Sequence, residues 1–290
     1  YINGGGSLIQ DVTSRRSLWF YLHNIQAAHK AGCKVQMYGC GIGPVLREQH
    51  RKLAARVLNA CVDVITLREP DSQKELQSMG VTRPEVLLTA DPALTLPAAS
   101  DDEIDSVLLR AGIPPRGNYL CFALRNWKGF ESKAPLFGQA AKYAYETYGL
   151  TPVFAAVEKH LDPGAGRLAA AGLDIPHYFL DDAGSAGTII GALSRMQAVV
   201  SMRLHALIFA AGQGIPLAGV VYDPKVSSFL RYIGQENFAD LDALTPDLLK
   251  SMIDRVAAAP ISPEEQEAAV RKLRQTEQVN VETARRLLGV

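Results

Sequence analysis

Apolar runs alternate with amphipathic segments along the first third of the chain. The strand-like runs lie at 34–38, 62–67 and 86–88, and the helix-like runs at 45–58 and 70–79. The second helix has clear boundary signals, because Pro70 stands at its first position and Gly80 directly follows its end. Such an alternation predicts a parallel β-sheet covered by helices.

A second series of the same kind follows a break in the pattern. Its strand-like runs lie at 118–124, 152–157, 198–200 and 217–221, with a helix at 132–148 and another beginning near 201. The break contains several Gly and Pro residues and a short helix with a capping box made by Ser100 and Glu103. We predict an α/β protein with two Rossmann-like domains. The predicted parts are an N-terminal domain at 1–97, a linker with a short helix at 98–116, a C-terminal domain at 117–261, and a final helix at 262–290.

The final helix is expected to pack back toward the first domain. Ser262 followed by proline is a good helix start. A long amphipathic helix needs a partner surface, and the spacing predicts an apolar face that consists of Ala268, Ala269, Leu273 and Val281.

Composition narrows the range of functions. Thirty basic and thirty acidic residues cancel, which argues against a nucleic-acid partner and against strong electrostatic membrane binding, so any cationic site must be local. The four cysteines lack metal-ligand spacing and are predicted to be reduced thiols of a cytoplasmic protein. No run is long and apolar enough for a membrane span. The chain opens at Tyr1 inside a strand-like run, so we expect the first domain to be incomplete at its start.

Two glycine-rich segments follow predicted strands. In Asn3-Gly-Gly-Gly-Ser-Leu, the backbone N–H groups of Gly5, Gly6 and Ser7 could approach a phosphate or a sugar, with a following helix adding its positive end. The alternative is a tight structural turn. The segment from Gly39 to Pro44 departs from a dinucleotide fingerprint, so a sugar or phosphate loop and a structural turn remain open there.

Arginines stand at several predicted strand ends, where parallel sheets bind ligands. Arg68 precedes a helix beginning with proline and is either a ligand contact or half of a rim ion pair with Glu69. Arg125 and Arg203 end two strands of the second series, and their planar guanidinium groups suit a carboxylate or phosphate. Together they suggest a shared anion pocket.

The segment SMRLHALIFAAGQGIP, residues 201–216, strengthens this interpretation. With Ser201 as N-cap, Arg203 and His205 would lie in the first helical turn, where the helix dipole disfavours cations. A bound anion would reverse that cost, although a packed core histidine is the alternative for His205. At the next strand end, Asp223 could accept a hydroxyl hydrogen bond and Lys225 could reach a phosphate, or both could simply start a helix.

These motifs together resemble the polysaccharide pyruvyl transferase family. The similar stretches are GGGSLIQD, GIGP, LREPDS, TADPAL, SMRLHALIFAAGQGIP and VYDPKV, in this order over nearly the whole chain. The resemblance is nearest to the enzymes that pyruvylate N-acetylmannosamine (ManNAc) in secondary cell-wall polymers of S-layer bacteria. It implies a fold like GT-B glycosyltransferases, with two domains facing a cleft. Family members begin with a further strand and a glycine-asparagine loop, which this sequence lacks.

The resemblance also implies a reaction and roles for residues. The family transfers a pyruvyl group from phosphoenolpyruvate, a co-substrate, to two sugar hydroxyls as a ketal, without a cofactor. It implies donor binding by Arg125, Arg203 and the Leu204 backbone, and we add Lys225 to this set. His205 is the predicted catalytic acid or base, because imidazole titrates near neutral pH, and Asp223 is the next candidate. Gly5, Gly6, Ser7 and Arg68 are assigned to the acceptor, and no metal ligands are predicted.

The expected partners are phosphoenolpyruvate and a lipid-linked or nucleotide-linked glycan. Contact with the inner face of the membrane would come through a lipid-linked acceptor. Two other functions stay open, namely a GT-B glycosyltransferase that uses a nucleotide sugar and a non-catalytic glycan-binding relative.

Overall fold

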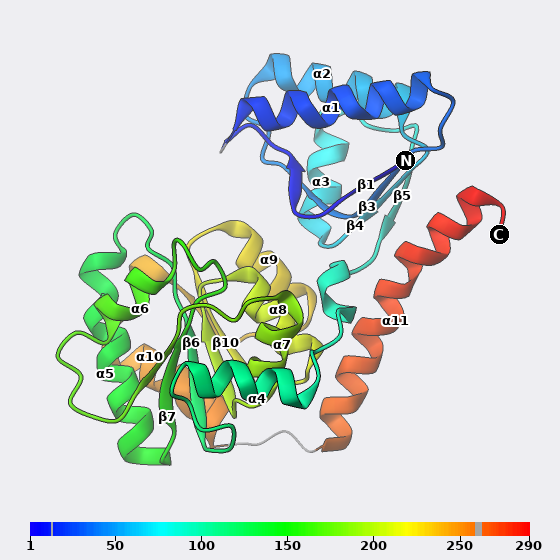
Figure 1. The fold of residues 1–290 in the computed structure, drawn as a ribbon. Helices are drawn as coiled ribbons and strands as arrows, with labels where there is room; N and C mark the ends of the chain where they lie inside the picture. Colours follow the sequence, from blue (N-terminus) through cyan, green and yellow to red (C-terminus); the bar gives the residue numbers. More distant parts are fainter. Residues whose placement is uncertain (13, 259–262) are drawn as a thin grey trace. The chain divides into compact units, whose positions relative to one another are not determined.

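The computed structural model describes residues 1–290 except residue 13 and residues 259–262. The chain divides into two compact units (Figure 1). Unit 1 consists of Tyr1–Leu94 and Lys272–Val290, and unit 2 of Thr95–Arg271. The chain therefore passes from unit 1 into unit 2 and back again.

Unit 1 contains a parallel sheet in which β1, β3, β4 and β5 lie side by side and β2 also pairs with β3. The strands are β1 (Ile2–Gly4), β2 (Ser7–Ile9), β3 (Gln36–Ile42), β4 (Val64–Leu67) and β5 (Glu85–Leu88). β1 pairs with the first half of β3 and β2 with its end. Gly5 and Gly6, both at positive φ, make the break between them, a conformation that glycine adopts without strain.

Helices cover both faces of the unit 1 sheet. They are α1 (Arg15–Lys30), α2 (Glu48–Cys61), α3 (Pro70–Met79) and the C-terminal part of α11 (Pro263–Leu288), with a 3₁₀ turn η1 (Pro92–Thr95). The strand order advances in one direction, and right-handed crossovers then place α1, α2 and α3 on the same face. Figure 1 shows these three helices on one side of the strands and α11 on the other.

Unit 2 contains six parallel strands in the order β11-β10-β9-β6-β7-β8. The strands are β6 (Tyr119–Ala123), β7 (Thr151–Ala155), β8 (Tyr178–Leu180), β9 (Ala198–Ser201), β10 (Leu217–Val221) and β11 (Phe238–Asp240). The chain starts at β6, adds β7 and β8 on one side, then returns to add β9 to β11 on the other. The point where the order reverses lies between β6 and β9, and open parallel sheets bind ligands at such a point.

The unit 2 sheet is covered on both faces. The helices are α4 (Asp101–Arg110), α5 (Phe130–Tyr148), α6 (Pro163–Ala169), α7 (Ala186–Ser194), α8 (Leu204–Gly212), α9 (Pro224–Tyr232) and α10 (Pro246–Ala257), with a 3₁₀ turn η2 (Leu241–Ala243). α5 packs on α6 and α10, whereas α4, α7, α8 and α9 form a second contiguous layer. Apolar side chains from the central strands and from α5 and α10 form one buried cluster.

The predicted linker at 98–116 is wrong. The boundary between the units lies between Leu94 and Thr95, and α4 belongs to unit 2, where it packs on α7. An ion pair between Arg195 and Asp101 joins the two helices at 2.6 Å. The capping box of Ser100 and Glu103 is confirmed. That box fixes where the helix starts, but it carries no information about the partner against which the helix packs.

The C-terminal segment Lys272–Val290 belongs to unit 1, but its predicted apolar face is wrong. Val281 is exposed, whereas Asn280 and Thr283 are buried. Asn280 donates to the Ala90 carbonyl at 2.9 Å and accepts from Thr89 Oγ1 at 2.9 Å. Polar side chains thus attach this helix to the rest of unit 1. The predicted helix start at Ser262, and Ala269 of the predicted face, lie outside the residues and side chains that the structure describes.

Candidate functional site

The carboxyl ends of the three central strands of unit 2 bring most of the predicted donor residues to one edge. Arg125 follows β6, Arg203 follows β9, and Asp223 and Lys225 follow β10. Because β6 and β9 flank the reversal of strand order, Arg125 and Arg203 stand on either side of it. This is the position at which open α/β sheets bind ligands.

Arg125 lies half-buried among aromatic side chains. Its guanidinium carbon is 5.0 Å from the centre of the Trp127 ring and 5.3 Å from that of the Tyr222 ring. Its Nη1 donates to Tyr222 Oη at 3.0 Å, and Lys225 Nζ lies 5.9 Å from the same ring. Two cations therefore share one tyrosine, a cluster with a net positive charge that suits an anionic ligand.

Arg203 has an internal partner that changes the predicted anion pocket. Asp162 precedes α6 and is 2% exposed, and its carboxylate accepts from Arg203 Nε at 2.8 and 2.9 Å and also from Nη2. The same carboxylate accepts the Val157 and Glu158 N–H groups at 3.1 and 2.8 Å. The charge of Arg203 at this helix start is thus balanced within the protein, and a ligand is not required to explain it.

The predicted N-cap of α8 is also wrong. Ser201 is the last residue of β9, and its Oγ accepts the Arg203 N–H at 2.8 Å and donates to the Ala123 carbonyl at 3.1 Å. Arg203 is the capping residue, and its side chain makes no capping bond. Leu204 is buried at the first helical position, and His205 is exposed at the second, with its ring 6.1 Å from that of Phe209. The structure therefore rules out a buried core histidine.

Asp223 and Lys225 form a helix start. Asp223 caps α9 by accepting the Lys225 N–H at 3.1 Å, and Lys225 Nζ lies 3.3 Å from its other oxygen. The positive end of α9 already holds a carboxylate, whereas the cap of α8 has no such side-chain acceptor. An added anion is therefore better stabilised at α8 than at α9.

In unit 1 the structure brings Ser7 and Arg68 together. Arg68 is 5% exposed and donates to Glu69 at 3.0 Å, to Asp91 at 2.7 Å and to Ser7 Oγ at 3.3 Å. Burial raises the pKa of the Glu69 carboxyl, and Arg68 opposes that effect. The guanidinium is thus part of a buried ion cluster that fixes the glycine loop, rather than a rim ion pair.

The two glycine segments differ from their predicted surroundings. Gly5 and Gly6 lead into β2, not into a helix, because α1 begins at Arg15 after its cap Ser14. Gly39 and Gly41 lie inside β3. A Cβ on Gly39 would come within 2.5 Å of the Pro92 ring, and one on Gly41 within 2.8 Å of Ser7 Oγ. These glycines permit close packing, which favours the structural interpretation of the segment 39–44.

Family comparison decides the identity of the chain. The model of the family called polysaccharide pyruvyl transferase matches residues 1–224. The chain belongs to this family. A search of curated proteins found no match.

Solved structures show the fold that this pyruvyl transferase family member shares with sugar enzymes. UDP-GlcNAc 2-epimerase of Neisseria meningitidis, bound to UDP-GlcNAc, superposes with a TM-score of 0.59 at 11% identity, over 98% of this chain and 76% of that one. A glycosyltransferase of Rickettsia africae gives a TM-score of 0.56 at 11% identity, over 96% and 83%. The fold is therefore of the GT-B type, as predicted, and identities this low show the fold alone.

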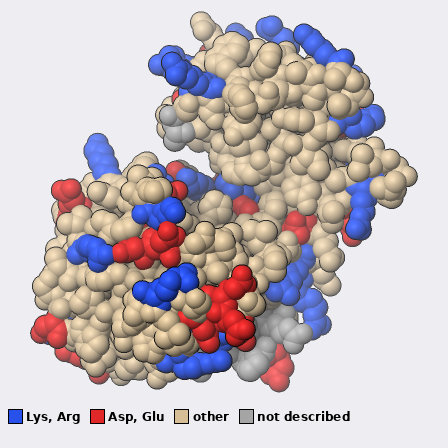
Figure 2. All heavy atoms as spheres, in the orientation of Figure 1, with Lys and Arg blue, Asp and Glu red and all other residues tan. Residues whose placement is uncertain are grey.

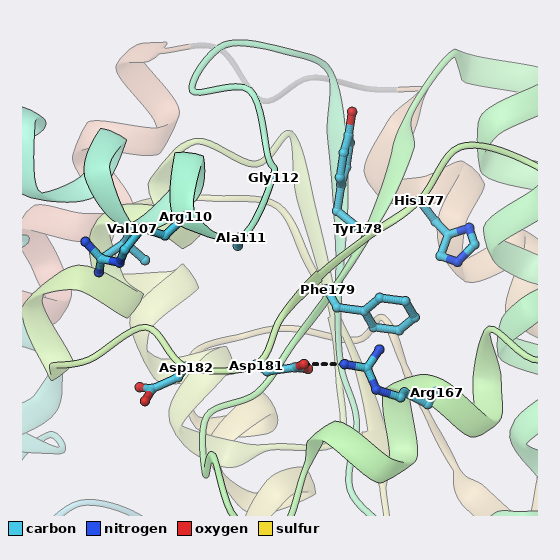
Figure 3. Close-up of a pocket in the computed structure, with 10 residues that line it drawn as sticks. All are labelled: Val107, Arg110, Ala111, Gly112, Arg167, His177, Tyr178, Phe179, Asp181 and Asp182. Atoms are coloured by element: carbon cyan, nitrogen blue, oxygen red, sulfur yellow. Dashed lines mark hydrogen bonds and ion pairs between the residues drawn. The ribbon is translucent and has the colours of Figure 1, made fainter.

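The pyruvyl transferase chain also has a depression at the edge strand β8 of unit 2. Its volume is about 540 Å³, and it lies beside α4 and β8 (Figure 3). Arg167 pairs with Asp181 there, and its guanidinium carbon lies 4.2 Å from the centre of the Phe179 ring. The lining residues are Val107, Arg110, Ala111, Gly112, Arg167, His177, Tyr178, Phe179, Asp181 and Asp182. Arg125, Arg203, His205 and Lys225 are not among them.

Sequence reasoning missed Asp162 and Tyr222 as parts of the unit 2 site. Asp162 carried one usable signal, because an Asp-Pro pair after a strand marks a helix start at a strand end. Tyr222 directly follows the last residue of β10.

Within the described part of the chain, no three His, Cys, Asp or Glu side chains are grouped for a metal ion. Each helix in the same residues is too short or too polar to cross a bilayer.

Proposed function

We propose that this family member transfers the pyruvyl group of phosphoenolpyruvate to two hydroxyls of ManNAc in a cell-wall polysaccharide, as a cyclic ketal. The observation that supports it best is the cationic edge at the strand reversal of unit 2. Arg125 and Lys225 share Tyr222 there, beside the α8 terminus. Phosphoenolpyruvate carries a carboxylate and a phosphate, and this edge offers cations and helix N–H groups suited to both.

The proposed reaction needs one proton to be added and two to be removed. A proton is added to the methylene carbon of the donor, which leaves an oxocarbenium-like centre at C2. One sugar hydroxyl attacks C2, phosphate leaves with its bonding electrons, and the second hydroxyl closes the ring, each hydroxyl losing its proton. His205, exposed on the first turn of α8, is the proposed acid or base for one of these transfers, with Asp223 as the next candidate.

Arg203 and Arg68 take different parts in this proposal. Arg203 is held by Asp162, so we assign it to orienting the start of α8, where Leu204 and His205 lie, and to facing the donor. Arg68 is buried, so its proposed contribution to the acceptor site is to hold Ser7 beside Gly5 and Gly6. A lipid-linked or nucleotide-linked glycan is the proposed acceptor.

Calorimetric titration of phosphoenolpyruvate tests the donor site. Arg125→Ala removes a charge-assisted hydrogen-bond donor, which is worth about 1.5–3 kcal/mol, so the affinity should fall roughly 10- to 150-fold. The matched control is Arg167→Ala, which removes an arginine from the depression of Figure 3 and should leave the affinity unchanged. If Arg167→Ala weakens binding and Arg125→Ala does not, the donor site lies in that depression.

Product analysis tests the reaction itself. Incubation with phosphoenolpyruvate and a nitrophenyl-linked GlcNAc–ManNAc acceptor should release phosphate and add the mass of pyruvic acid less one water. Tight binding of UDP-GlcNAc without binding of phosphoenolpyruvate would support the glycosyltransferase alternative. Binding of the acceptor without phosphate release would support the non-catalytic one.

A further inference from the structure

Unit 1 exposes large apolar side chains around the start of α1 and just before α2. Val12 is 56% exposed, Trp19 54%, Phe20 60% and Leu46 72%. Trp19 and Phe20 belong to α1, which buries Leu18, Leu22 and Ile25 on another face. Isolated exposed apolar residues are common, but a cluster of this kind beside polar groups marks an interaction surface.

An Asp11–His50 pair holds three of these residues in one place. The Trp19 ring lies edge-on to the His50 ring at 6.5 Å, and His50 Nδ1 is 2.7 Å from Asp11. Asp11 also accepts the Leu46 N–H at 2.8 Å, and Val12 follows it in the chain. We call Val12, Trp19, Phe20 and Leu46, with Arg15, Arg16 and Arg47, the α1 patch.

The α1 patch is positively charged. Arg15 and Arg16 are exposed one helical turn before Trp19 and Phe20, and α1 contains no acidic residue. Arg47 is exposed beside Leu46, while the carboxylate of Asp11 is buried and its side chain is 1% exposed. Glu48, which follows Arg47 in the sequence, pairs with Lys52 at 3.3 Å.

The charge of the patch agrees with that of the unit as a whole. Unit 1 has 15 basic and 10 acidic residues, and unit 2 has 15 basic and 20 acidic residues. In the face drawn in Figure 2, Lys and Arg side chains are spread over the unit that contains α1 and α2, with few acidic side chains beside them. A net charge of +5 against −5 makes unit 1 the side that an anionic surface attracts.

We propose that the α1 patch docks unit 1 on the surface of an anionic lipid bilayer. Tryptophan and phenylalanine settle at the boundary between headgroups and acyl chains, and arginines beside them contact lipid phosphates. A second copy of the chain fits less well, because a symmetric contact through this patch would place the arginines against themselves. The inference stands apart from the proposed reaction, since it uses the surface of unit 1 alone.

The whole chain carrying Trp127→Phe tests this proposal, because Trp19 is then its single tryptophan. The protein should sediment with vesicles that contain phosphatidylglycerol and much less with vesicles of phosphatidylcholine alone. Trp19 emission should shift to shorter wavelength, and brominated acyl chains should quench it. Raised salt should weaken binding, because screening shortens the reach of the arginines.

Variants separate insertion from simple charge attraction. Trp19→Ser combined with Leu46→Ser should lower binding at least tenfold, and Arg15→Gln combined with Arg16→Gln should reduce the preference for phosphatidylglycerol. The control is Leu109→Ser, which changes a leucine of unit 2 that is 61% exposed and should bind as the parent does.

Three outcomes would overturn the proposal. They are absence of vesicle binding, binding without a change in Trp19 emission, and a dimer in sedimentation velocity that Leu46→Ser abolishes. Turnover of a nitrophenyl-linked acceptor needs no membrane and is measured in proteins that keep Trp127, because Trp127 lies beside Arg125. Loss of vesicle binding with normal turnover therefore concerns the patch, and loss of turnover with normal vesicle binding concerns the proposed reaction.

Discussion

Asp162 fixes the position of the Arg203 guanidinium at the edge of the unit 2 sheet by an ion pair. The pair is almost completely buried, with 1% of the Asp162 side chain and 14% of the Arg203 side chain exposed. Removing one partner of a buried ion pair leaves the other charge uncompensated, which costs about 3–5 kcal/mol. Because Arg203 keeps some contact with solvent, the lower end of this range applies.

Asp162→Ala should therefore lower the free energy of unfolding of unit 2 by about 3 kcal/mol. Urea unfolding followed by Trp127 emission in a Trp19→Phe background measures this, because the two tryptophans lie in different units. Asp174→Ala, which breaks an exposed pair with Lys142, is the control and should leave the midpoint almost unchanged. Adding Arg203→Met to Asp162→Ala should recover part of the loss. No change in midpoint would show that the pair does not stabilise the unit.

His205 is the residue whose role is most open to a direct test. Glutamine keeps much of its size and hydrogen bonding but cannot titrate, so His205→Gln should lower turnover by about 10²- to 10⁴-fold. Calorimetry should show a much smaller change in affinity for phosphoenolpyruvate. Arg203→Lys should do the reverse, because lysine cannot reproduce the planar contact with Asp162 or with an anion. Near-normal turnover of His205→Gln would transfer the acid or base role to Asp223.

At the scale of elements, α11 is attached to unit 1 by hydrogen bonds rather than by an apolar seam. Asn280 accepts from Gln36 through its backbone carbonyl at 3.0 Å and bonds Thr89 and Ala90 through its side chain. Asn280→Ala would leave the Ala90 carbonyl without this buried donor, at a cost of about 1–3 kcal/mol. Trp19 emission in a Trp127→Phe background should report this loss in urea, whereas the exposed neighbour substitution Val281→Ala should have little effect. An unchanged midpoint for Asn280→Ala would contradict the proposed attachment.

The sequence could predict elements wherever their signals are local. The helix of α3 begins at Pro70 and ends before Gly80 as predicted, and α4 begins with its capping box. The face of α11 could not be predicted in this way, because Asn280 is buried only by meeting groups 190 residues away in the chain. Hydrophobic periodicity detects apolar faces and is blind to a polar residue whose partner is a backbone carbonyl.

The same limit applies to the candidate site. The strand-end rule brought Arg125 and Arg203 to one edge from sequence alone. The partner of Arg203, Asp162, lies 41 residues earlier in the chain. It follows β7, where no candidate site residue was predicted from the sequence. The helix dipole correctly indicated a negative charge beside Arg203. That charge is the carboxylate of Asp162, which belongs to the protein itself. Helix electrostatics indicate the sign of a missing charge and do not indicate its source.

At the scale of the whole molecule, the net charge of the chain does not indicate how each unit responds to an anionic surface. A balance of thirty against thirty argued against electrostatic attraction to membranes, yet folding separates it into a basic unit and an acidic one. The net charge of zero is the sum of +5 for unit 1 and −5 for unit 2. Charge counted for each unit is the quantity that bears on which side of the protein meets an anionic surface.

The return of Lys272–Val290 to unit 1 also sets an order of assembly on the ribosome. The sheet of unit 1 is made first, but the helix that covers its second face follows only after the whole of unit 2. At about 5–20 residues per second, this delay is on the order of 10–35 s. Throughout it, Gln36, Thr89 and Ala90 lack the partner that Asn280 later provides. A nascent chain paused just before Lys272 would thus carry all of the residues of unit 2 and an unfinished unit 1.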